Sequence, residues 1–475
     1  MKKNSSIAVL LAAGAGRKFW PYNEVRNKCA FPIANEPLVL RLARQLREIG
    51  FSRLVMVVGV EVSSVRAALR PLGEENVVWV RQPATEVGTA AAARAALEVV
   101  GAPSGKESAL VVYGDIVVAT EDLRAAWQLH TESQAAAVAL CAPLAGERPQ
   151  DWIGVSPRHP RAGGGSALSG VEGHGRDASH RMAGVYALGP AAWPYLRAAH
   201  GPMAHVQVGA MPSAEAELAD VVATMADEGQ DVAALETLHP CVDVDKPWHI
   251  LEATEAVLQQ MACQCGKTSA IHPSASVSDG AEIEGPVVVG PCATVGKRVV
   301  LRGPAWIGAG ARVINGAILN SPVLVGESSR VSDYCLIGGG SVIGRECVVG
   351  HGAEFDGVML DHAYIYHYSE IAGVLGLAVD IGAATVCGTL RFDDTATIHR
   401  IGGRREMPRT GANATYFGDY SRTGVNVITQ PGVKIGAYSC VGPGIVLYED
   451  VPSRKLMLLK QETIQRDWGP ERYGW

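Results

Sequence analysis

The 475-residue sequence contains no apolar run long enough to cross a membrane as a helix. It also lacks an excess of basic residues, because its formal net charge at pH 7 is −6. This balance argues against a nucleic-acid partner and against a polybasic membrane contact. The apolar segment at residues 7–13 is short and leads into a glycine loop, so we interpret it as a buried strand and not as a signal peptide.

The ten cysteines lack the spacing of a disulfide framework. Cys263 and Cys265 are the only close pair, and one residue separates them where zinc and redox motifs have two. We therefore expect reduced thiols in a cytoplasmic protein. A chain of this length is expected to hold two or three domains.

Strands and helices alternate in the first half of the sequence, which predicts an α/β domain with a mostly parallel, Rossmann-like sheet. The expected strands cover residues 7–11, 54–58, 77–80 and 110–113, and the expected helices cover 38–49, 62–69 and 89–100. In such sheets, ligands bind at the carboxyl ends of the strands. We therefore expect the chemistry after Leu11, after Val80 and after Tyr113.

A small turn rich in glycine and cations follows the first expected strand. It contains Ala12, Ala13, Gly14, Gly16, Arg17 and Lys18, and Lys28 lies downstream. Backbone amides of such a turn can cradle phosphate, and the cations can neutralise it. The third glycine of the dinucleotide-binding motif is absent, because Phe19 stands at that position. The turn therefore suits a nucleoside triphosphate better than a dinucleotide.

The two other strand ends also carry residues that suit a bound nucleotide. Gln82, Gly88 and Thr89 follow the third expected strand, and the two small residues leave room for a base near the backbone. Gly114 and Asp115 follow the fourth, and the carboxylate is placed to hold a hard divalent cation.

Together and in this order, these motifs resemble those of the sugar-1-phosphate nucleotidyltransferases, over residues 6–260. The segment 242–248 resembles the family's stretch that supplies a second metal carboxylate and leads into a linker helix. The resemblance implies that Asp115 and Asp243 hold Mg²⁺, that Gln82 and Gly88 contact the base, and that Lys28 contacts the sugar phosphate. It implies transfer of a nucleotidyl group from a nucleoside triphosphate to a sugar-1-phosphate, with release of pyrophosphate.

The sequence departs from that family in the phosphate loop and in the sugar pocket. Lys18 stands where the family has arginine, with Arg17 beside it as a substitute. Glu172 matches the sugar-binding glutamate, with Gly114 as a further sugar contact, but Gly173 replaces the family's next lysine. Besides an active enzyme, these changes leave open a non-catalytic or weakly active regulator that binds nucleotide sugars.

Every sixth residue from Ile271 to Phe355 is aliphatic or, at the last position, aromatic. The fifteen positions are Ile271, Val277, Ile283, Val289, Val295, Leu301, Ile307, Val313, Leu319, Val325, Val331, Ile337, Ile343, Val349 and Phe355. A six-residue period fits a solenoid of short strands, each of which sends one apolar side chain inward. This resembles the hexapeptide-repeat family, whose fold is an all-β left-handed parallel β-helix.

The hexads falter at Asp361, and the later motifs resemble the archaeal-type bifunctional enzymes that acetylate glucosamine-1-phosphate and then uridylylate it. The matching segments are His367, 382–385, 389–393, 423–427 and 431–436. By this match, His367 is the general base of an acetyl transfer from acetyl-coenzyme A. Glu370, Asp380 and Thr389 depart from the family's amino-sugar contacts, so a β-helix that only assembles the protein stays an alternative.

His367 has two further interpretations. It could be a structural corner residue, or it could bind zinc with His351 and His362, which resembles the β-helical carbonic anhydrases that bind zinc at subunit interfaces. The basic stretch 391–413 is either a solvated hairpin or a contact for a coenzyme A phosphate.

The expected domain order is a nucleotidyltransferase domain at 1–246, a linker helix at 247–265, a β-helix at 266–452 and a C-terminal tail at 453–475. Flat faces of short strands are typical of proteins that pack as homotrimers, so we expect a trimer built through the β-helix.

Overall fold

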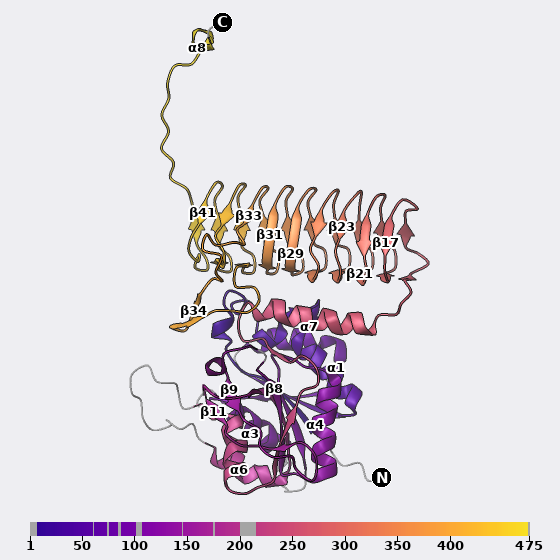
Figure 1. Cartoon of the computed structure of the whole chain (residues 1–475), viewed down its shortest axis with the longest axis vertical. Coiled ribbons are helices and arrows are strands. Elements are labelled where there is room, and N and C mark those ends of the chain that lie inside the picture. Colours follow the sequence, from indigo (N-terminus) through magenta and orange to yellow (C-terminus); the bar gives the residue numbers. More distant parts are fainter. Residues whose placement is uncertain are drawn as a thin grey trace.

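The computed structural model describes residues 7–59, 61–73, 76–83, 87–100, 107–144, 146–173, 176–199 and 215–473. Figure 1 shows an α/β domain, a long helix beside it, and a β-helix stacked on that helix. None of the helices in these ranges has the length and apolar character needed to cross a membrane.

The α/β domain is built on a twisted mixed sheet whose first four strands are parallel. These are β6 (Ala109–Tyr113), β1 (Ile7–Ala12), β4 (Arg53–Val58) and β5 (Val77–Arg81), in that spatial order. The sheet continues from β6 through β12 (His180–Leu188), which is antiparallel to both of its neighbours, to β8 (Ala137–Pro143) and β13 (Val232–Glu236). All six residues of β1 are buried, which explains its continuous apolar sequence.

Helices cover the sheet where the sequence predicts them: α1 (Leu38–Ile49), α2 (Val62–Leu69) and α3 (Thr89–Val99), with α4 (Thr120–Ser133) in addition. Residues 146–173 contain three short strands. They are β9 (Ile153–Val155), β10 (Ser166–Ala167) and β11 (Glu172–Gly173). Strand β10 pairs with β13, β9 pairs with β12, and β11 pairs with β9, which satisfies backbone groups of these strands.

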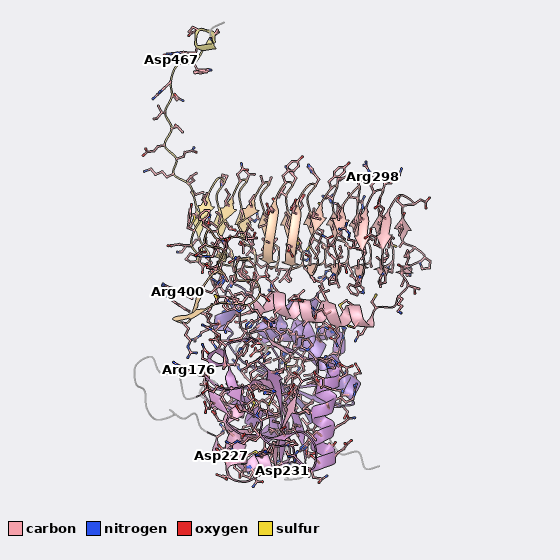
Figure 2. All side chains as sticks on the ribbon, viewed as in Figure 1. Arg176, Asp227, Asp231, Arg298, Arg400 and Asp467 are labelled. Atoms are coloured by element: carbon pink, nitrogen blue, oxygen red, sulfur yellow. The ribbon has the colours of Figure 1, made fainter. Side chains whose placement is uncertain are left out.

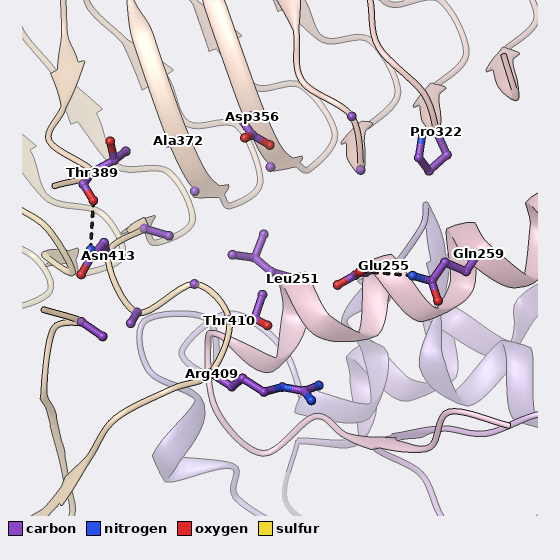
Figure 3. A pocket seen from close by; sticks show the side chains of 18 of the residues that line it. Leu251, Glu255, Gln259, Pro322, Asp356, Ala372, Thr389, Arg409, Thr410 and Asn413 are labelled. Atoms are coloured by element: carbon purple, nitrogen blue, oxygen red, sulfur yellow. Dashed lines mark hydrogen bonds between the residues drawn. The ribbon is translucent and has the colours of Figure 1, made fainter. Parts of the chain in front are cut away.

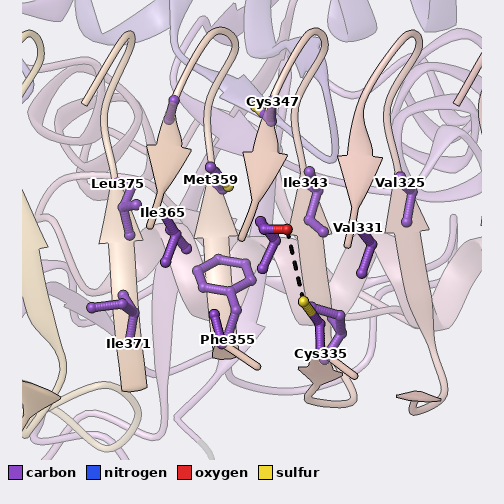
Figure 4. Close-up of a cluster of buried hydrophobic side chains, with 14 of the residues drawn as sticks. Val325, Val331, Cys335, Ile343, Cys347, Phe355, Met359, Ile365, Ile371 and Leu375 are labelled. Atoms are coloured by element: carbon purple, nitrogen blue, oxygen red, sulfur yellow. Dashed lines mark hydrogen bonds between the residues drawn. The ribbon is translucent and has the colours of Figure 1, made fainter. Parts of the chain in front are cut away.

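The second half is a parallel β-helix whose successive coils are in register every eighteen residues, as with Ile271 and Val289. Each coil therefore holds three hexads. From Val289 to Phe355 every hexad residue lies in one continuous core, part of which Figure 4 shows. Ile271 is 45% exposed because the first coil has a neighbour on one side only. The predicted architecture, an α/β domain followed by a parallel β-helix, is confirmed.

The hexads falter at Asp361 because the coils become shorter there. Strand β29 (Glu354–Met359) runs without a turn across two faces and pairs with both β26 (Leu336–Ile337) and β27 (Ser341–Ile343). Paired residues of β29 and β31 (Glu370–Leu375) are sixteen positions apart in the sequence, where earlier coils have eighteen. This coil therefore lacks the two residues of one corner.

This flattened face packs against the α/β domain through α7 (His249–Gln264). A shared apolar core joins aromatic residues of the first domain, helix α7 and the β-helix. The hydroxyl of Tyr22 donates to the carbonyl of Val374 at 2.8 Å, and Arg26 pairs with Asp419 at 2.6 Å. The two domains therefore form one packed unit.

The basic stretch 391–413 contains an antiparallel hairpin of β34 (His399–Ile401) and β35 (Arg404–Glu406). Arg400 is exposed on it, as Figure 2 shows. His399 and Glu406, however, are buried against the α/β domain. The hairpin is confirmed, but it is docked and not simply solvated.

Candidate active site

Hydrogen bonds from a neighbouring segment fix the conformation of the turn after β1. The side-chain amide of Asn27 donates to the carbonyls of Ala12, at 3.1 Å, and Gly14, at 3.3 Å. Gly16 has a φ of 59°, and a Cβ there would lie 3.3 Å from the Cβ of Lys28. Glycine at this position therefore lets the turn approach the lysine closely.

Asp115 and Asp243 are brought side by side by backbone contacts. A Cβ on Gly114 would meet the carbonyl oxygen of Leu11 at 2.7 Å, so only glycine allows the end of β6 to approach the end of β1. Strands β7 (Ile116–Val117) and β14 (Val242–Asp243) are antiparallel partners, and the N–H of Val244 donates to the carbonyl of Asp115 at 2.9 Å. The predicted pairing of the two carboxylates is thus geometrically possible.

Lys28 is the centre of the site. Its ammonium lies 2.7 Å from the carboxylate of Asp115 and 3.1 Å from that of Asp245. Only 10% of its side chain is exposed. Lys18 reaches the other oxygen of Asp245 at 3.3 Å, but 59% of its side chain is exposed. Two cations and three carboxylates therefore meet at the strand ends.

Burial and charge set the protonation of this cluster. Burial alone would lower the pKa of Lys28, but Asp115, Asp245 and Asp243 raise it well above its usual range. Burial, reinforced by the Asp115 charge, raises the pKa of Asp243 to about 7. Burial would also raise the pKa of Asp245, but Lys28 and Lys18 hold it below its usual value. Asp243 is therefore the carboxylate with the weakest local compensation.

Carboxylate oxygens and nearby phosphate suit Mg²⁺, which proteins bind through one or two carboxylates plus substrate phosphates. Asp115 and Asp243 provide such a pair, and burial together with the Asp115 charge raises the pKa of Asp243, so a bound cation would favour its ionised form. No group of three or more His, Cys, Asp or Glu side chains in the described ranges is arranged to hold a metal. The residues present therefore fit a magnesium ion shared with a substrate.

The remaining predicted nucleotide residues lie along the sheet edge. The amide of Gln82 donates to the carbonyl of Gly88 at 3.1 Å, and a Cβ on Gly88 would meet the carbonyl oxygen of Ala216 at 2.3 Å. The hydroxyl of Thr89 donates to Glu217 at 2.6 Å and accepts from the N–H of Leu218 at 2.8 Å. Thr89 thus fastens the start of α6 (Leu218–Asp227) to α3.

Two other predicted residues are exposed. Arg17 is exposed at the start of a single 3₁₀ turn, η1 (Arg17–Phe19). Glu172 is exposed on β11, which pairs with β9 at the sheet edge. Lys18, Lys28, Asp115 and Asp243 are therefore the predicted residues that the structure brings together.

Sequence reasoning missed Asp245 and Asn27. The sequence did carry a signal for Asp245, because residues two apart on an extended segment point to the same side, so Asp243 predicts a second carboxylate there. Asn27 directly precedes Lys28, but its role in shaping the turn depends on contacts that no local pattern predicts.

His367 lies on the outer surface of the β-helix. Its ring stacks on His351 with 5.0 Å between centroids, and Tyr368 packs edge-on at 5.4 Å. His362 pairs with Glu346 at 3.3 Å instead of joining them. The three histidines therefore do not form a zinc site among the described residues of this chain.

A cavity of about 730 Å³ opens between α7 and the flattened face of the β-helix (Figure 3). Glu255 from α7, Asp356 from β29 and Arg409 from the root of the hairpin line it. The cavity is separate from the Lys28 cluster and from His367, since neither contributes to its lining.

Comparison with known proteins identifies the first domain. Residues 8–260 match the family model of the MobA-like NTP transferase domain. The chain belongs to this family. The predicted nucleotidyltransferase is confirmed, and the strand ends carrying Lys28 and the carboxylates lie inside the matched region.

Individual relatives cover one or both halves of the chain. A bifunctional sugar-1-phosphate nucleotidylyltransferase/acetyltransferase of Sulfurisphaera tokodaii is 26% identical over 453 residues, which cover 94% of this chain and 98% of the relative. The bifunctional protein GlmU of Methanococcus maripaludis is 29% identical over 128 residues, 26% of this chain and 30% of the relative. A UTP-bound UGPase structure from Acinetobacter baumannii is 20% identical with a TM-score of 0.45, covering 54% of this chain and 94% of that one.

Proposed function

We propose that the α/β domain transfers a nucleotidyl group from a nucleoside triphosphate to a sugar-1-phosphate in a Mg²⁺-dependent reaction. The observation that carries this proposal is the buried Lys28 ammonium held between the carboxylates of Asp115 and Asp245. A cation and carboxylates that converge at the strand ends are what the stabilisation of charge in such a transfer requires.

In the proposed reaction, an oxygen of the sugar-1-phosphate attacks the α-phosphorus of the triphosphate. A new phosphorus–oxygen bond forms, the α–β bridging bond breaks, and its electron pair leaves with pyrophosphate. Lys28 and Lys18 neutralise the phosphate oxygens, while the turn 12–16 cradles the triphosphate. Bound to Asp115 and Asp243, Mg²⁺ would supply further charge neutralisation. Gln82 and Gly88 would meet the base, and Gly114 and Glu172 would meet the sugar.

The second proposed activity is acetyl transfer from acetyl-coenzyme A to an amino sugar, with His367 as the general base. Its support is the relative named for both activities, which aligns with 94% of this chain, and the exposed position of His367. Tyr334 and Tyr368 are 62% and 63% exposed on the same β-helix, and we propose that a homotrimer covers them. The proposed domain division is 1–246, 247–265, 266–452 and 453–475.

The test is a screen of four nucleoside triphosphates against a panel of sugar-1-phosphates, with pyrophosphate release measured in Mg²⁺ and in EDTA. The proposal expects release from at least one pair, only with Mg²⁺. Nucleotide binding without release for any pair would support a regulator instead.

A further inference from the structure

Glu406, in the hairpin of the β-helix domain, contacts the segment that carries the carboxylates. Lys246 directly follows Asp245, and its ammonium lies 2.6 Å from the carboxylate of Glu406, in strand β35. Both side chains are enclosed, with exposed fractions of 5% and 11%. An ion pair this deeply buried depends on both partners, because removing one leaves an uncompensated charge.

Aromatic rings from both domains surround the pair. The ammonium of Lys246 lies 5.6 Å from the ring of Trp152 and 5.9 Å from that of Trp248. The ring of His399, in the hairpin, packs on Trp248 with 4.9 Å between centroids. These rings limit the access of water, so the direct ion pair with Glu406 fixes the position of the Lys246 ammonium, whose charge reaches Asp245 only through space.

The hairpin is fastened to the α/β domain and α7 at further points. Arg148 donates to the carbonyl of Arg405 at 3.4 Å, and Arg409 lies 3.5 Å from Glu252 of α7. A Cβ on Gly411 would lie 2.7 Å from a methyl group of Leu251, so the root of the hairpin packs closely on α7. Glu406 is therefore held in place independently of Lys246.

Without Glu406, the carboxylates beside Lys246 in the chain become its alternative partners. Asp245 already accepts Lys28 and Lys18, and Asp243 is needed for the magnesium pair. A third lysine turned toward this segment would compete with both. Glu406 thus keeps a buried cation away from the carboxylates.

We propose that Glu406 is a positioning residue for nucleotidyl transfer, through which the β-helix hairpin holds Lys246 away from Asp245 and Asp243. The proposal rests on the proposed function of the α/β domain. It makes the β-helix part of the nucleotidyl transfer site and not merely an assembly or acetyl-transfer module.

The experiment compares Glu406→Gln with a matched control, Arg400→Gln, which removes an exposed charge from the same hairpin. We expect Glu406→Gln to lower kcat of pyrophosphate release about tenfold, because reacting groups tolerate little misplacement. KM for the sugar-1-phosphate should change less than about twofold, because Glu406 contacts no substrate. Arg400→Gln should behave like the wild type.

Adding Lys246→Gln to Glu406→Gln should restore kcat to within about threefold of the wild type, because the uncompensated cation is then gone. A merely structural role of Glu406 predicts that kcat and the unfolding temperature fall together in Glu406→Gln and recover together in the double variant. The positioning role predicts that Glu406→Gln loses kcat while it remains folded at the assay temperature. Unchanged kcat in Glu406→Gln, an equal loss in Arg400→Gln, or a double variant as poor as the single one would each overturn the proposal.

Calorimetric titration with Mg²⁺–nucleotide gives a second readout. We expect weaker binding in Glu406→Gln and recovery in the double variant, with thermal unfolding showing that both are folded. If the wild type releases no pyrophosphate, the proposed function fails, while the calorimetric comparison still decides the role of Glu406: equal affinities would refute it.

Discussion

The two candidate sites differ in how much of their environment one chain supplies. Lys28 is enclosed among three carboxylates from two distant segments of the α/β domain. His367 lies on the surface of the β-helix with aromatic neighbours on its own coil and the preceding one. The first site is assembled within the chain, and the second needs a further surface to become a pocket.

The architecture of each domain explains this difference. Parallel strands bring their carboxyl ends to one edge, so residues far apart in sequence converge there. A β-helix turns its apolar hexad residues inward and leaves flat outer faces, whereas binding sites are concave. A neighbouring copy could supply the missing wall beside His367.

The largest expected effect separates the two sites completely. His367→Ala should lower thiol release from acetyl-coenzyme A with glucosamine-1-phosphate about a thousandfold, because a general base typically contributes about a hundredfold to ten-thousandfold. Pyrophosphate release should remain as in the wild type. A thiol assay with His272→Ala as control checks this, since His272 is exposed at the start of the β-helix. Unchanged thiol release would make His367 a structural residue.

The converse change concerns the carboxylate pair. Asp115→Asn and Asp243→Asn should each lower pyrophosphate release at least about a hundredfold, because one carboxylate holds Mg²⁺ too loosely. Thiol release should be spared. Asp467→Asn is the control, because Asp467 lies on the extended tail away from both domains (Figure 2). Wild-type activity in either variant would remove that residue from the site.

The site around Lys28 and the carboxylates should also depend on pH through proton binding by Asp243. The pKa of Asp243 is raised from 3.8 to about 7, so below pH 7 the metal-free chain holds a proton that Mg²⁺ must displace. The affinity for Mg²⁺–nucleotide should rise up to about tenfold per pH unit from pH 5 to 7 and level off above it. The same raised pKa means that stability of the metal-free protein falls as pH rises from about 4 to 7. Calorimetry at several pH values checks the affinity, and Asp243→Asn should flatten its slope.

The smallest effect tests the phosphate turn. Lys18→Arg should raise the rate of pyrophosphate release a few-fold, because arginine can bind phosphate through two hydrogen bonds. Arg17→Ala is the matched comparison. If Arg17 already replaces the family's arginine, this second variant should be the damaging one and Lys18→Arg should be neutral. Steady-state kinetics of both variants decides between them.

The sequence predicts the convergence of Lys28, Asp115 and Asp243 because strand ends follow from hydrophobic patterning and the family motifs. It also predicts the β-helix core, because each hexad forms one side of a coil and turns one apolar side chain inward. The shortened coils at β29 could not be predicted, because no single residue indicates that one corner of the coil is missing.

The docking of Glu406 on Lys246 could not be predicted, because it depends on how two domains pack across 160 positions of sequence. Thr89 likewise makes a contact that local sequence patterns do not predict. Its nucleotide binding stays a prediction, but its contact with the start of α6 could not be predicted, because Thr89 and Glu217 are 128 positions apart in the sequence.

The most direct test of the contrast is to measure both activities and the oligomeric state of the same protein over a dilution series. Mass photometry would give the population of assemblies at each concentration. We predict that pyrophosphate release per chain stays constant, while thiol release per chain falls in step with the loss of trimers. Thiol release that persists in a monomeric chain, or a parallel fall of both activities, would contradict this account.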